Sequence, residues 1–557
     1  MSGRTNEAPG KRLLLAAAIA VTAIAALHHA LELAVRLAQT SDSAQGFVAG
    51  HAIAGGNLLL SGWHFPVDDY YFTDAVPYAA FERLAGARPF LLALVPAVTY
   101  VLFVLAALVC STGASRPLLK NLESAAAVAL LLSAPVWIGR WDPFLLSDMH
   151  FATVLGAFIA LALCTHIAGL ESPDATPLVP AALTLLVITS ATVASDPFSL
   201  VFAFGPALTV IAAEAVLRPG RMTRIALSLL LAGIALGLFL PPAIASAGGF
   251  TTEDDVLPGL VSARFLGRNL IALLFGMFRL FGADFAEMHR GFWSTLLLII
   301  RCTALGIVVA AVIRAARRLP GRDRALLFDR FLCAGTITVL AACAVSAQFA
   351  KGITPQNLWV GGPVMRYIMP AMLFGSMLAA REMPDMLAAL PSARLRNTAR
   401  GILGFIAAVV LIAGGSLSWA AAQPDWIARN PPAIAARWLA RHRLVEGVGE
   451  YWSANLITAI SGDEVRVRSV VAADGKLAPY VWVEDGRWYA RAPQFVVWQD
   501  NNQTGLGFRD VSATYAICRT ALVAGYRIAI LTDAPGSASA CWGAKHPTGE
   551  TALPKNR

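Results

Sequence analysis

Acidic side chains gather in one polar stretch that follows the first apolar run of the chain. Asp42 stands close behind this run, and Asp68, Asp69 and Asp74 follow before the next apolar run begins near residue 90. Carboxylates held at a membrane surface repel one another unless a ligand or a partner uses them. A carboxylate in such a position can take a proton from a hydroxyl group as a general base. We therefore predict that this stretch carries the chemistry, with these four residues as the candidate catalytic groups.

Aromatic and imidazole side chains lie among these acids. Trp63, His64 and Tyr70 could support the binding of a polar acceptor, although aromatic residues also anchor helices at the level of lipid headgroups. Asp42 has a second interpretation, because Ser-Asp-Ser suits the N-cap of a short helix over Ser43–Ala54. The two roles of Asp42 are compatible.

Further candidates stand near the ends of later apolar runs. His150 and Asp196 could support acceptor binding, with a helix cap or an interface residue as the alternative for each. Guanidinium and ammonium groups pair with phosphate oxygens, and an arginine at the membrane boundary is costly unless it pairs, snorkels or grips an anion. The four basic candidates are Arg264, Arg268, Lys351 and Arg366. For Arg264 and Arg268, the alternative is a position on an amphipathic helix whose basic side chains snorkel to the membrane surface.

The composition of the 557-residue chain indicates what kind of protein must position these groups. Hydrophobic residues make up 57% and charged residues 14%, with a mean hydropathy of +0.62. No soluble domain of this size has such a composition, so we predict a polytopic, mainly α-helical membrane protein. The net charge of +9 comes mostly from basic loops that set topology, which makes nucleic acid a poor partner.

About eleven apolar runs are long enough to span a bilayer, and we expect the first to be retained as a helix. Basic residues cluster before the first run and after the second, sixth, eighth and tenth. This pattern predicts a cytoplasmic N-terminus and an extracytoplasmic C-terminus. The expected spans lie near residues 13–35, 90–111, 121–138, 150–170, 177–194, 198–217, 225–247, 292–313, 331–349, 363–380 and 401–421.

The chain changes character after residue 421. We expect residues 422–557 to form a small extracytoplasmic α/β domain behind a membrane module of residues 1–421, whose first outer loop is 36–89. An amphipathic helix is predicted over Pro432–Val445, and alternating apolar runs separated by turn signals predict strands. Cys518 and Cys541 form a disulfide or remain two free thiols. The expected strands cover residues 464–471, 480–483, 495–498 and 526–531.

The order of these features resembles the GT-C superfamily of membrane glycosyltransferases. The resemblance rests on Asp42 just after the first span, a short helix, and further acids before the second span. It rests also on an Arg-Tyr-x-x-Pro setting at Arg366 and on the tail domain. The stretch Gly56-Asn57-x-Leu59-Leu60-x-Gly62-Trp63 is similar to bacterial members of the superfamily. The resemblance covers the whole chain and implies the bacterial inner, cytoplasmic membrane.

The resemblance implies a sugar donor linked to polyprenyl phosphate and a cell-envelope glycan or lipid as acceptor. It also implies a first-loop carboxylate as general base for an inverting displacement, with Asp42 the closest match and Asp68, Asp69 or Asp74 as alternatives. Arg366 is the closest match to a ligand of the donor phosphate. No Asp-Glu pair follows the first span and no Trp-Trp-Asp motif stands in the tail, unlike oligosaccharyltransferases. With a single donor phosphate to neutralise, we expect no metal cofactor, with a divalent ion as the open alternative.

Three other kinds of protein compete with this interpretation. A multi-span transporter would place charges near the bilayer midplane, often on broken helices in repeated halves. The acids here cluster outside the apolar runs, and no two halves match. A polymerase or ligase of lipid-linked glycans would share the logic of the glycosyltransferase. A non-catalytic membrane protein that presents its tail domain is the third alternative.

Overall fold

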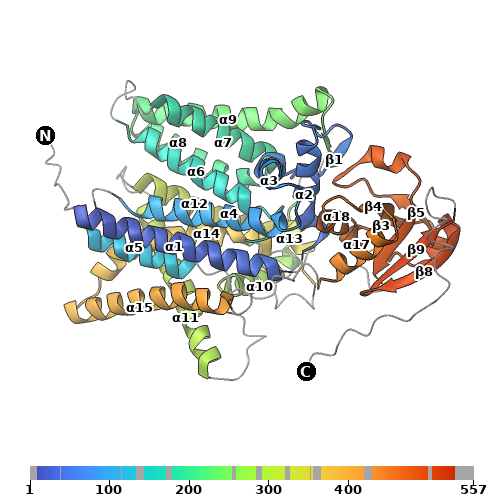
Figure 1. The fold of residues 1–557 in the computed structure, drawn as a ribbon. Coiled ribbons are helices and arrows are strands. Elements are labelled where there is room, and N and C mark those ends of the chain that lie inside the picture. Colours follow the sequence, from blue (N-terminus) through green and yellow to red (C-terminus); the bar gives the residue numbers. More distant parts are fainter. Residues whose placement is uncertain are drawn as a thin grey trace.

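The molecule consists of a bundle of long helices and a smaller part that contains a β-sheet (Figure 1). The computed structural model describes residues 9–37, 39–113, 116–132, 144–170, 178–253, 259–283, 292–319, 326–351, 353–354, 365–419, 430–499 and 505–532. The helical bundle holds the N-terminal part of the chain, and the sheet lies against one end of the bundle near the C-terminus. The prediction of a mainly helical membrane protein is confirmed.

Nine helices within the described residues are long and apolar enough to cross a membrane. Two other expected spans are also helical, but α5 is short in its described part and α14 carries four charged residues. Each of the eleven expected spans therefore corresponds to a helix. These helices are α1 (Pro9–Arg36), α4 (Leu91–Ser111), α5 (Leu118–Leu132), α6 (Phe151–Ala168), α7 (Leu178–Ser195), α8 (Gly205–Leu217) with a preceding π-helical turn (Leu200–Phe204), α9 (Arg221–Ser246), α11 (Phe292–Arg318), α12 (Leu327–Val345), α14 (Met365–Ala388) and α15 (Ala393–Trp419).

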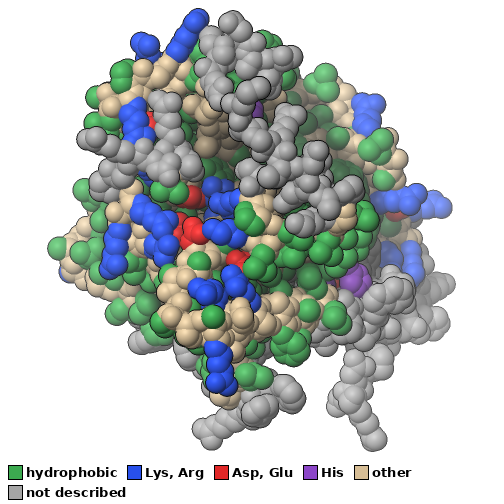
Figure 2. All heavy atoms as spheres, turned by 90° about the vertical axis from the view of Figure 1, so that its left-hand side faces the viewer, with side chains coloured by type: hydrophobic (Ala, Val, Ile, Leu, Met, Phe, Trp, Pro, Cys, Tyr) green, Lys and Arg blue, Asp and Glu red, His purple; other side chains and the backbone are tan. Residues whose placement is uncertain are grey.

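Basic side chains gather at the end of the bundle that lies away from the sheet (Figure 2). Several of them form ion pairs that join neighbouring helices. Arg314 and Arg318 of α11 both pair with Glu382 of α14, at 2.8 and 2.7 Å. A guanidinium beside a buried carboxylate supplies the partner that the carboxylate loses when water is removed. Further pairs at the helix ends are Arg381–Asp329, Arg400–Glu123, Arg330–Glu214 and Lys120–Asp385.

The first loop folds into a compact unit between α1 and α4. It contains α2 (Ser41–Ala54), β1 (Trp63–Phe65), a π-helical turn (Tyr71–Ala75) and α3 (Val76–Ala85). Thr40 caps α2 in a capping box with Ser43, whose hydroxyl accepts a hydrogen bond from the Thr40 amide at 2.9 Å. The interpretation of Asp42 as the N-cap is therefore wrong. The cap lies two residues earlier and leaves the Asp42 carboxylate free for another contact.

The tail forms a six-stranded mixed sheet in the order β5-β4-β3-β7-β9-β8. The three central strands β4, β3 and β7 are parallel, β5 and β9 pair antiparallel with β4 and β7, and β8 pairs antiparallel with β9. Helices pack on this sheet, as the pattern of the sequence predicts. The elements are α17 (Pro431–Arg441), β3 (Glu446–Glu450), α18 (Tyr451–Ile460), β4 (Arg466–Ala473), β5 (Lys476–Pro479), β7 (Phe495–Gln499), α19 (Phe508–Thr514), β8 (Ile517–Val523) and β9 (Tyr526–Leu531).

Two expectations about the tail concern the run 480–483 and the cysteines Cys518 and Cys541. The run 480–483 is not a strand of this sheet but a connection between β5 and the short β6 (Glu484–Asp485), because its aromatic side chains turn towards a cavity. The choice between a Cys518–Cys541 disulfide and two free thiols involves Cys541, which lies outside the described residues.

Backbone pairing joins the tail to the first loop. β1 of the first loop pairs in parallel with β2 (Thr251–Thr252) and antiparallel with β6 of the tail. The register places Trp63 opposite Asp485, and His64 opposite both Glu484 and Thr251. Three segments far apart in the sequence thus form one small sheet.

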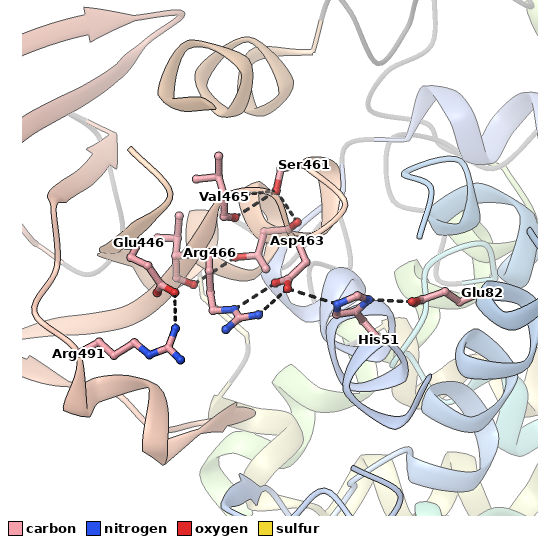
Figure 3. A network of polar contacts seen from close by, with 10 residues as sticks. His51, Glu82, Glu446, Ser461, Asp463, Val465, Arg466 and Arg491 are labelled. Atoms are coloured by element: carbon pink, nitrogen blue, oxygen red, sulfur yellow. Dashed lines mark hydrogen bonds and ion pairs between the residues drawn. The ribbon is translucent and has the colours of Figure 1, made fainter. Parts of the chain in front are cut away.

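A network of charged side chains makes a second connection between the two parts (Figure 3). The imidazole of His51 on α2 lies 2.8 Å from Glu82 of α3 through Nδ1 and 3.3 Å from Asp463 of the tail through Nε2. Asp463 also accepts a hydrogen bond from Arg466 at 2.5 Å. The hydrogen bond with Asp463 is the largest influence that raises the pKa of His51, which reaches about 9, so the imidazole is a cation at neutral pH.

The basic end and the sheet should lie on opposite sides of the membrane. Arg318 is the last residue of α11 and belongs to the basic end, where it pairs with Glu382. The tail docks at the other end of the bundle. We expect topology reporters fused after Arg318 and after Thr532 to give opposite signals, with the reporter after Arg318 cytoplasmic. Equal signals from the two fusions would contradict this arrangement.

The His51 contact should give the docking of the tail a pH dependence. The pKa of His51 rises from 6.5 to about 9 on folding, so its stabilisation is complete below pH 6.5 and is lost as the pH rises through 9. We expect the melting temperature in detergent to fall between pH 7 and pH 10 more steeply for the wild type than for His51→Gln. His166→Gln, at an exposed position on α6, is the matched control and should keep the wild-type slope. If the melting temperature of His51→Gln fell with pH as steeply as that of the wild type, His51 would not be the source of this pH dependence.

Candidate functional site

A cavity of about 490 Å³ lies where the first loop, the bundle and the tail meet. Its wall combines carboxylates, one arginine, one histidine and several aromatic rings. A pocket with convergent polar groups at the junction of separate structural parts is a typical place for a binding or active site. The lining residues are Asp42, Gln45, Pro66, Val67, Asp68, Tyr70, Asp148, His150, Asp196, Pro197, Phe198, Gln348, Arg366, Tyr367, Tyr451, Trp452, Tyr480 and Trp482.

Asp42 reaches the cavity from the first turn of α2. Its Oδ1 accepts a hydrogen bond of 2.5 Å from the Tyr451 hydroxyl, which belongs to the first residue of α18 in the tail. The position near a helix N-terminus also favours a negative charge. Asp42 is only half-buried, unlike the neighbouring acids Asp69, Asp74 and Asp148. A base that exchanges a proton with a substrate needs such access.

A chain of side chains runs from Asp196 to Asp68 along the cavity wall. The His150 Nδ1 lies 2.7 Å from Asp196 Oδ2 and 3.0 Å from the Tyr70 hydroxyl. The Tyr70 hydroxyl donates to Asp68 Oδ2 at 3.1 Å. Since the single proton of Tyr70 goes to Asp68, the contacts assign the Nδ1 proton of His150 to Asp196. Asp196 thereby orients the imidazole, and Tyr70 orients Asp68.

Three residues at the cavity have backbone conformations that L-amino acids rarely adopt. Tyr70, Asp148 and His150 have φ angles of 49°, 58° and 67°. Each such residue costs free energy and persists only where the surrounding contacts fix it. The Tyr70 amide donates to the carbonyl of Ser195 at 3.0 Å, and Asp148 Oδ2 accepts from the Gly46 amide at 3.0 Å. These contacts hold the segments that carry the polar wall in their strained conformations.

A second layer of acids lies behind the wall. Asp74 Oδ1 accepts from the amide of Asp148 at 3.4 Å, and Asp69 Oδ1 accepts from the amide of Tyr71 at 2.8 Å. Burial raises the pKa of Asp74 to about 6 and raises those of Asp69 and Asp148 well above the usual range. Burial raises the pKa of Asp68 as well. These acids are held by protein contacts, and burial favours their neutral form.

Arg366 brings a positive charge to the cavity from the first turn of α14. Its Nη2 donates to the Tyr367 hydroxyl at 2.9 Å, its guanidinium lies 5.0 Å from the centre of the Tyr367 ring, and its Nη1 lies 4.0 Å from the sulfur of Met149. Within the described part of the chain it forms no ion pair, and its buried Nε has no hydrogen-bond partner. A guanidinium in this setting is available to an anion that enters the cavity.

The structure brings together six of the residues that the sequence singles out, namely Asp42, Asp68, Tyr70, His150, Asp196 and Arg366. Asp69 and Asp74 are buried behind the wall. Trp63 packs in the apolar core beneath the loop, and His64 Nδ1 lies 2.7 Å from the hydroxyl of Thr251.

The three other basic candidates lie away from the cavity lining. Arg264 and Arg268 belong to the amphipathic helix α10 (Ala263–Leu280), and each places its guanidinium 4.6 Å from the centre of the Phe265 ring. Arg268 also donates to the carbonyl of Ala350 at 3.0 Å. Lys351 ends the short helix α13 (Ala347–Lys351) and is exposed. Their role in binding phosphate stays a prediction.

Twelve of the eighteen lining residues were not among the sequence candidates, and five of these are Asp148 and four aromatic residues of the tail. Asp148 stands two residues before His150, and this proximity to a candidate residue is the sequence feature that could have identified it. Tyr451, Trp452, Tyr480 and Trp482 come from the tail, whose alternating aromatic residues are typical of strands. Only the docking of the tail reveals that these rings face Asp42.

No group of three or more His, Cys, Asp or Glu residues within the described ranges could hold a metal ion. The carboxylates of the cavity are separated by their own contacts with Tyr451, Tyr70, Gly46 and His150. The role of a metal therefore stays a matter for experiment.

Solved structures similar to this chain include two crystal structures of ArnT from Cupriavidus metallidurans. The structure bound to undecaprenyl phosphate is 12% identical, has a TM-score of 0.47, and the match covers 95% of this chain and 99% of that one. The structure in the apo state is 11% identical, has a TM-score of 0.39, and the match covers 93% and 97%. ArnT is a GT-C membrane glycosyltransferase that depends on polyprenyl phosphate.

No family model and no curated protein sequence matches the chain. The solved structures belong to the superfamily that the sequence resembles, but both TM-scores lie below 0.5. The function must therefore be argued from the residues of the cavity itself.

Proposed function

We propose that this chain is a membrane glycosyltransferase of the GT-C type that moves a sugar from a polyprenyl-phosphate donor to a cell-envelope acceptor. The observation that carries the proposal is Arg366, a cavity-lining arginine without an ion pair among the described residues, in the same cavity as Asp42 and Asp68. One group suited to a phosphate thus shares a cavity with groups suited to a hydroxyl. A transferase that uses a lipid phosphate as leaving group needs both.

The contrast with arginines at the basic end of the bundle supports an anionic ligand at Arg366. Arg314, Arg318, Arg381 and Arg400 all pair with carboxylates of neighbouring helices. Those pairs stabilise the bundle and leave no charge for a ligand. Arg366 contacts neutral groups instead, so a phosphate that binds there replaces no protein ion pair.

Position along α14 supports a lipid donor. Arg366 and Glu382 lie sixteen positions apart on one helix, which corresponds to roughly 24 Å along the helix axis. The ion-paired end and the cavity end are therefore separated by most of the thickness of a hydrocarbon core, about 30 Å. A polyprenyl chain between the helices could place its phosphate at Arg366 and its sugar in the cavity.

Asp42 is the best candidate for the general base. In the proposed step its carboxylate takes the proton of an acceptor hydroxyl, and the acceptor oxygen forms a bond with the anomeric carbon. The bond between that carbon and the phosphate oxygen breaks, and its electron pair leaves with the polyprenyl phosphate. Arg366 stabilises the charge that develops on the leaving phosphate. Attack opposite the leaving group inverts the anomeric configuration.

The other acids suit supporting roles. Burial raises the pKa values of Asp68, Asp69 and Asp148, which favours their neutral form and lowers the fraction that is ionised and ready to accept a proton. Asp68 is held by Tyr70 and lines the cavity, so it can bind a sugar hydroxyl. In this proposal the acceptor binds on the side of the tail, and the basic-loop pattern supports an extracytoplasmic location of that side.

The Arg366→Ala variant should bind the donor lipid weakly. Losing a charge-assisted contact with a buried phosphate costs about 2–4 kcal/mol, or roughly a thirtyfold loss of affinity at the lower limit. We expect this loss for undecaprenyl phosphate in titrations of the purified protein, with Arg366→Lys retaining part of the affinity. Arg264→Ala, on α10 and outside the cavity, is the control. Equal affinity in Arg366→Ala and the wild type would rule out this role.

The Asp42→Asn variant should fold and lose turnover. Asp42 does not cap α2, and an asparagine oxygen can still accept the hydrogen bond from Tyr451. We expect the rate of sugar transfer from the polyprenyl-phosphate donor to fall by roughly a hundredfold or more, the scale of a lost general base. Asp385→Asn, in an exposed pair with Lys120 at the basic end, is the matched control. Wild-type turnover in Asp42→Asn beside an inactive Asp68→Asn would move the base to Asp68.

Turnover should not depend on a divalent metal ion. A single donor phosphate at Arg366 requires less charge neutralisation than a pyrophosphate. We expect the rate of sugar transfer to be unchanged after treatment with EDTA and dialysis. A loss of activity that Mg²⁺ or Mn²⁺ restores would show that a metal takes part in the reaction.

A further inference from the structure

Four aromatic side chains of the tail form one side of the cavity. Tyr451 and Trp452 begin α18, and Tyr480 and Trp482 lie in the connection between β5 and β6. We refer to these four residues as the aromatic wall. None of them is needed for the proton transfer or the phosphate contact of the proposed function, apart from the hydroxyl of Tyr451.

The rings of the aromatic wall brace one another. Tyr480 and Trp482 are parallel to within 8°, with ring centres 6.2 Å apart. Tyr451 meets Tyr480 edge to face at 5.3 Å and Trp452 at 5.1 Å. The Tyr451 hydroxyl is fixed by its hydrogen bond to Asp42. The wall is therefore a preformed surface whose position is tied to the proposed base.

This surface is not buried by the protein. Trp452 exposes 36% of its area, and Tyr480 and Trp482 are half-buried. Aromatic residues in membrane proteins often anchor the fold at the headgroup level, but these rings line the same cavity as Asp42 and Asp68. Large apolar faces that open into a cavity gain free energy when a ligand covers them.

The charges around the wall limit the chemistry of that ligand. Asp42, Asp68, Asp148 and Asp196 supply hydrogen-bond acceptors to the same cavity, and its one arginine, Arg366, is assigned to the donor phosphate, so an anionic acceptor would lack a cationic partner. A hydrocarbon chain would leave their oxygens without hydrogen bonds. A ligand that suits both features is uncharged, offers hydroxyl donors to carboxylate oxygens and presents an apolar C–H face to a ring. A pyranose ring has these properties.

We propose that the aromatic wall is the acceptor subsite and that the acceptor is a neutral saccharide whose ring stacks on Trp452 and on the Tyr480–Trp482 pair. This inference rests on the proposed function, because it assigns the wall to the acceptor. Arg366 on α14 holds the donor phosphate at the bundle, so the donor approaches from the spans. The wall belongs to the tail and touches Asp42, which places the acceptor hydroxyl beside its base.

The test measures saccharide binding without any donor. The purified full chain in nanodiscs is titrated with maltotriose and mannotriose as neutral probes and with trigalacturonate as an acidic probe, using saturation-transfer NMR. We expect at least one neutral trisaccharide to bind, and trigalacturonate to bind more weakly. Trp452→Ala and Trp482→Ala should each weaken binding of the neutral probe by about fivefold to tenfold, the scale of a lost aromatic contact. Phe508→Ala, at an exposed aromatic residue of α19, should bind like the wild type.

Undecaprenyl phosphate binding is measured in the same variants, so that the two proposals can fail separately. Wild-type donor binding in Trp452→Ala and Trp482→Ala, together with lost saccharide binding, supports the acceptor subsite. Saccharide binding that is equal in the Trp variants and in Phe508→Ala overturns it, as does the absence of neutral saccharide binding in the wild type or a preference for trigalacturonate. Failure of the wild type to bind undecaprenyl phosphate would instead overturn the proposed donor, whatever the saccharides show.

Discussion

A single hydrogen bond, from the Tyr451 hydroxyl to Asp42, joins the two parts of the molecule at the wall of the cavity. The partners lie 409 positions apart in the sequence. Pairing of β1 with β6 and the contact between His51 and Asp463 hold the same two parts together. Without this docking the cavity would lose the side formed by Tyr451, Trp452, Tyr480 and Trp482. The site exists because the tail packs on the first loop.

The two ends of the bundle differ in how their charged side chains are paired. At the basic end, arginines and buried carboxylates from different helices neutralise each other, as Arg318 and Glu382 do. At the cavity end, burial raises the pKa values of several carboxyl groups, and Arg366 contacts neutral partners. Structural ion pairs are satisfied within the protein, whereas the cavity keeps groups whose interactions are completed by a ligand. This difference separates the architecture of the bundle from its proposed chemistry.

Sequence patterns predicted the helices of the bundle well, because the thickness of a bilayer sets the length of an apolar run. They also predicted that Asp42 and Arg366 lie at the same end of the bundle, since both residues stand where a span meets a polar segment. The cap of α2 was missed because Thr40 and Ser43 form a better capping box than Asp42 offers. The segment 480–483 was predicted as a strand because alternating aromatic residues look alike in a strand and in a cavity wall. Burial of Asp69 and Asp74 depends on the fold of the first loop and could not be read from spacing.

The central claim is that a lipid phosphate binds at Arg366 with its sugar end in the cavity. An electron cryo-microscopy structure of the wild-type protein in nanodiscs with undecaprenyl phosphate would test it most directly. The account predicts density for the phosphate within hydrogen-bonding distance of the Arg366 guanidinium, and density for the polyprenyl chain between the helices next to α14. Phosphate density beside Arg264 and Arg268 on α10, with the cavity free of lipid, would contradict the account.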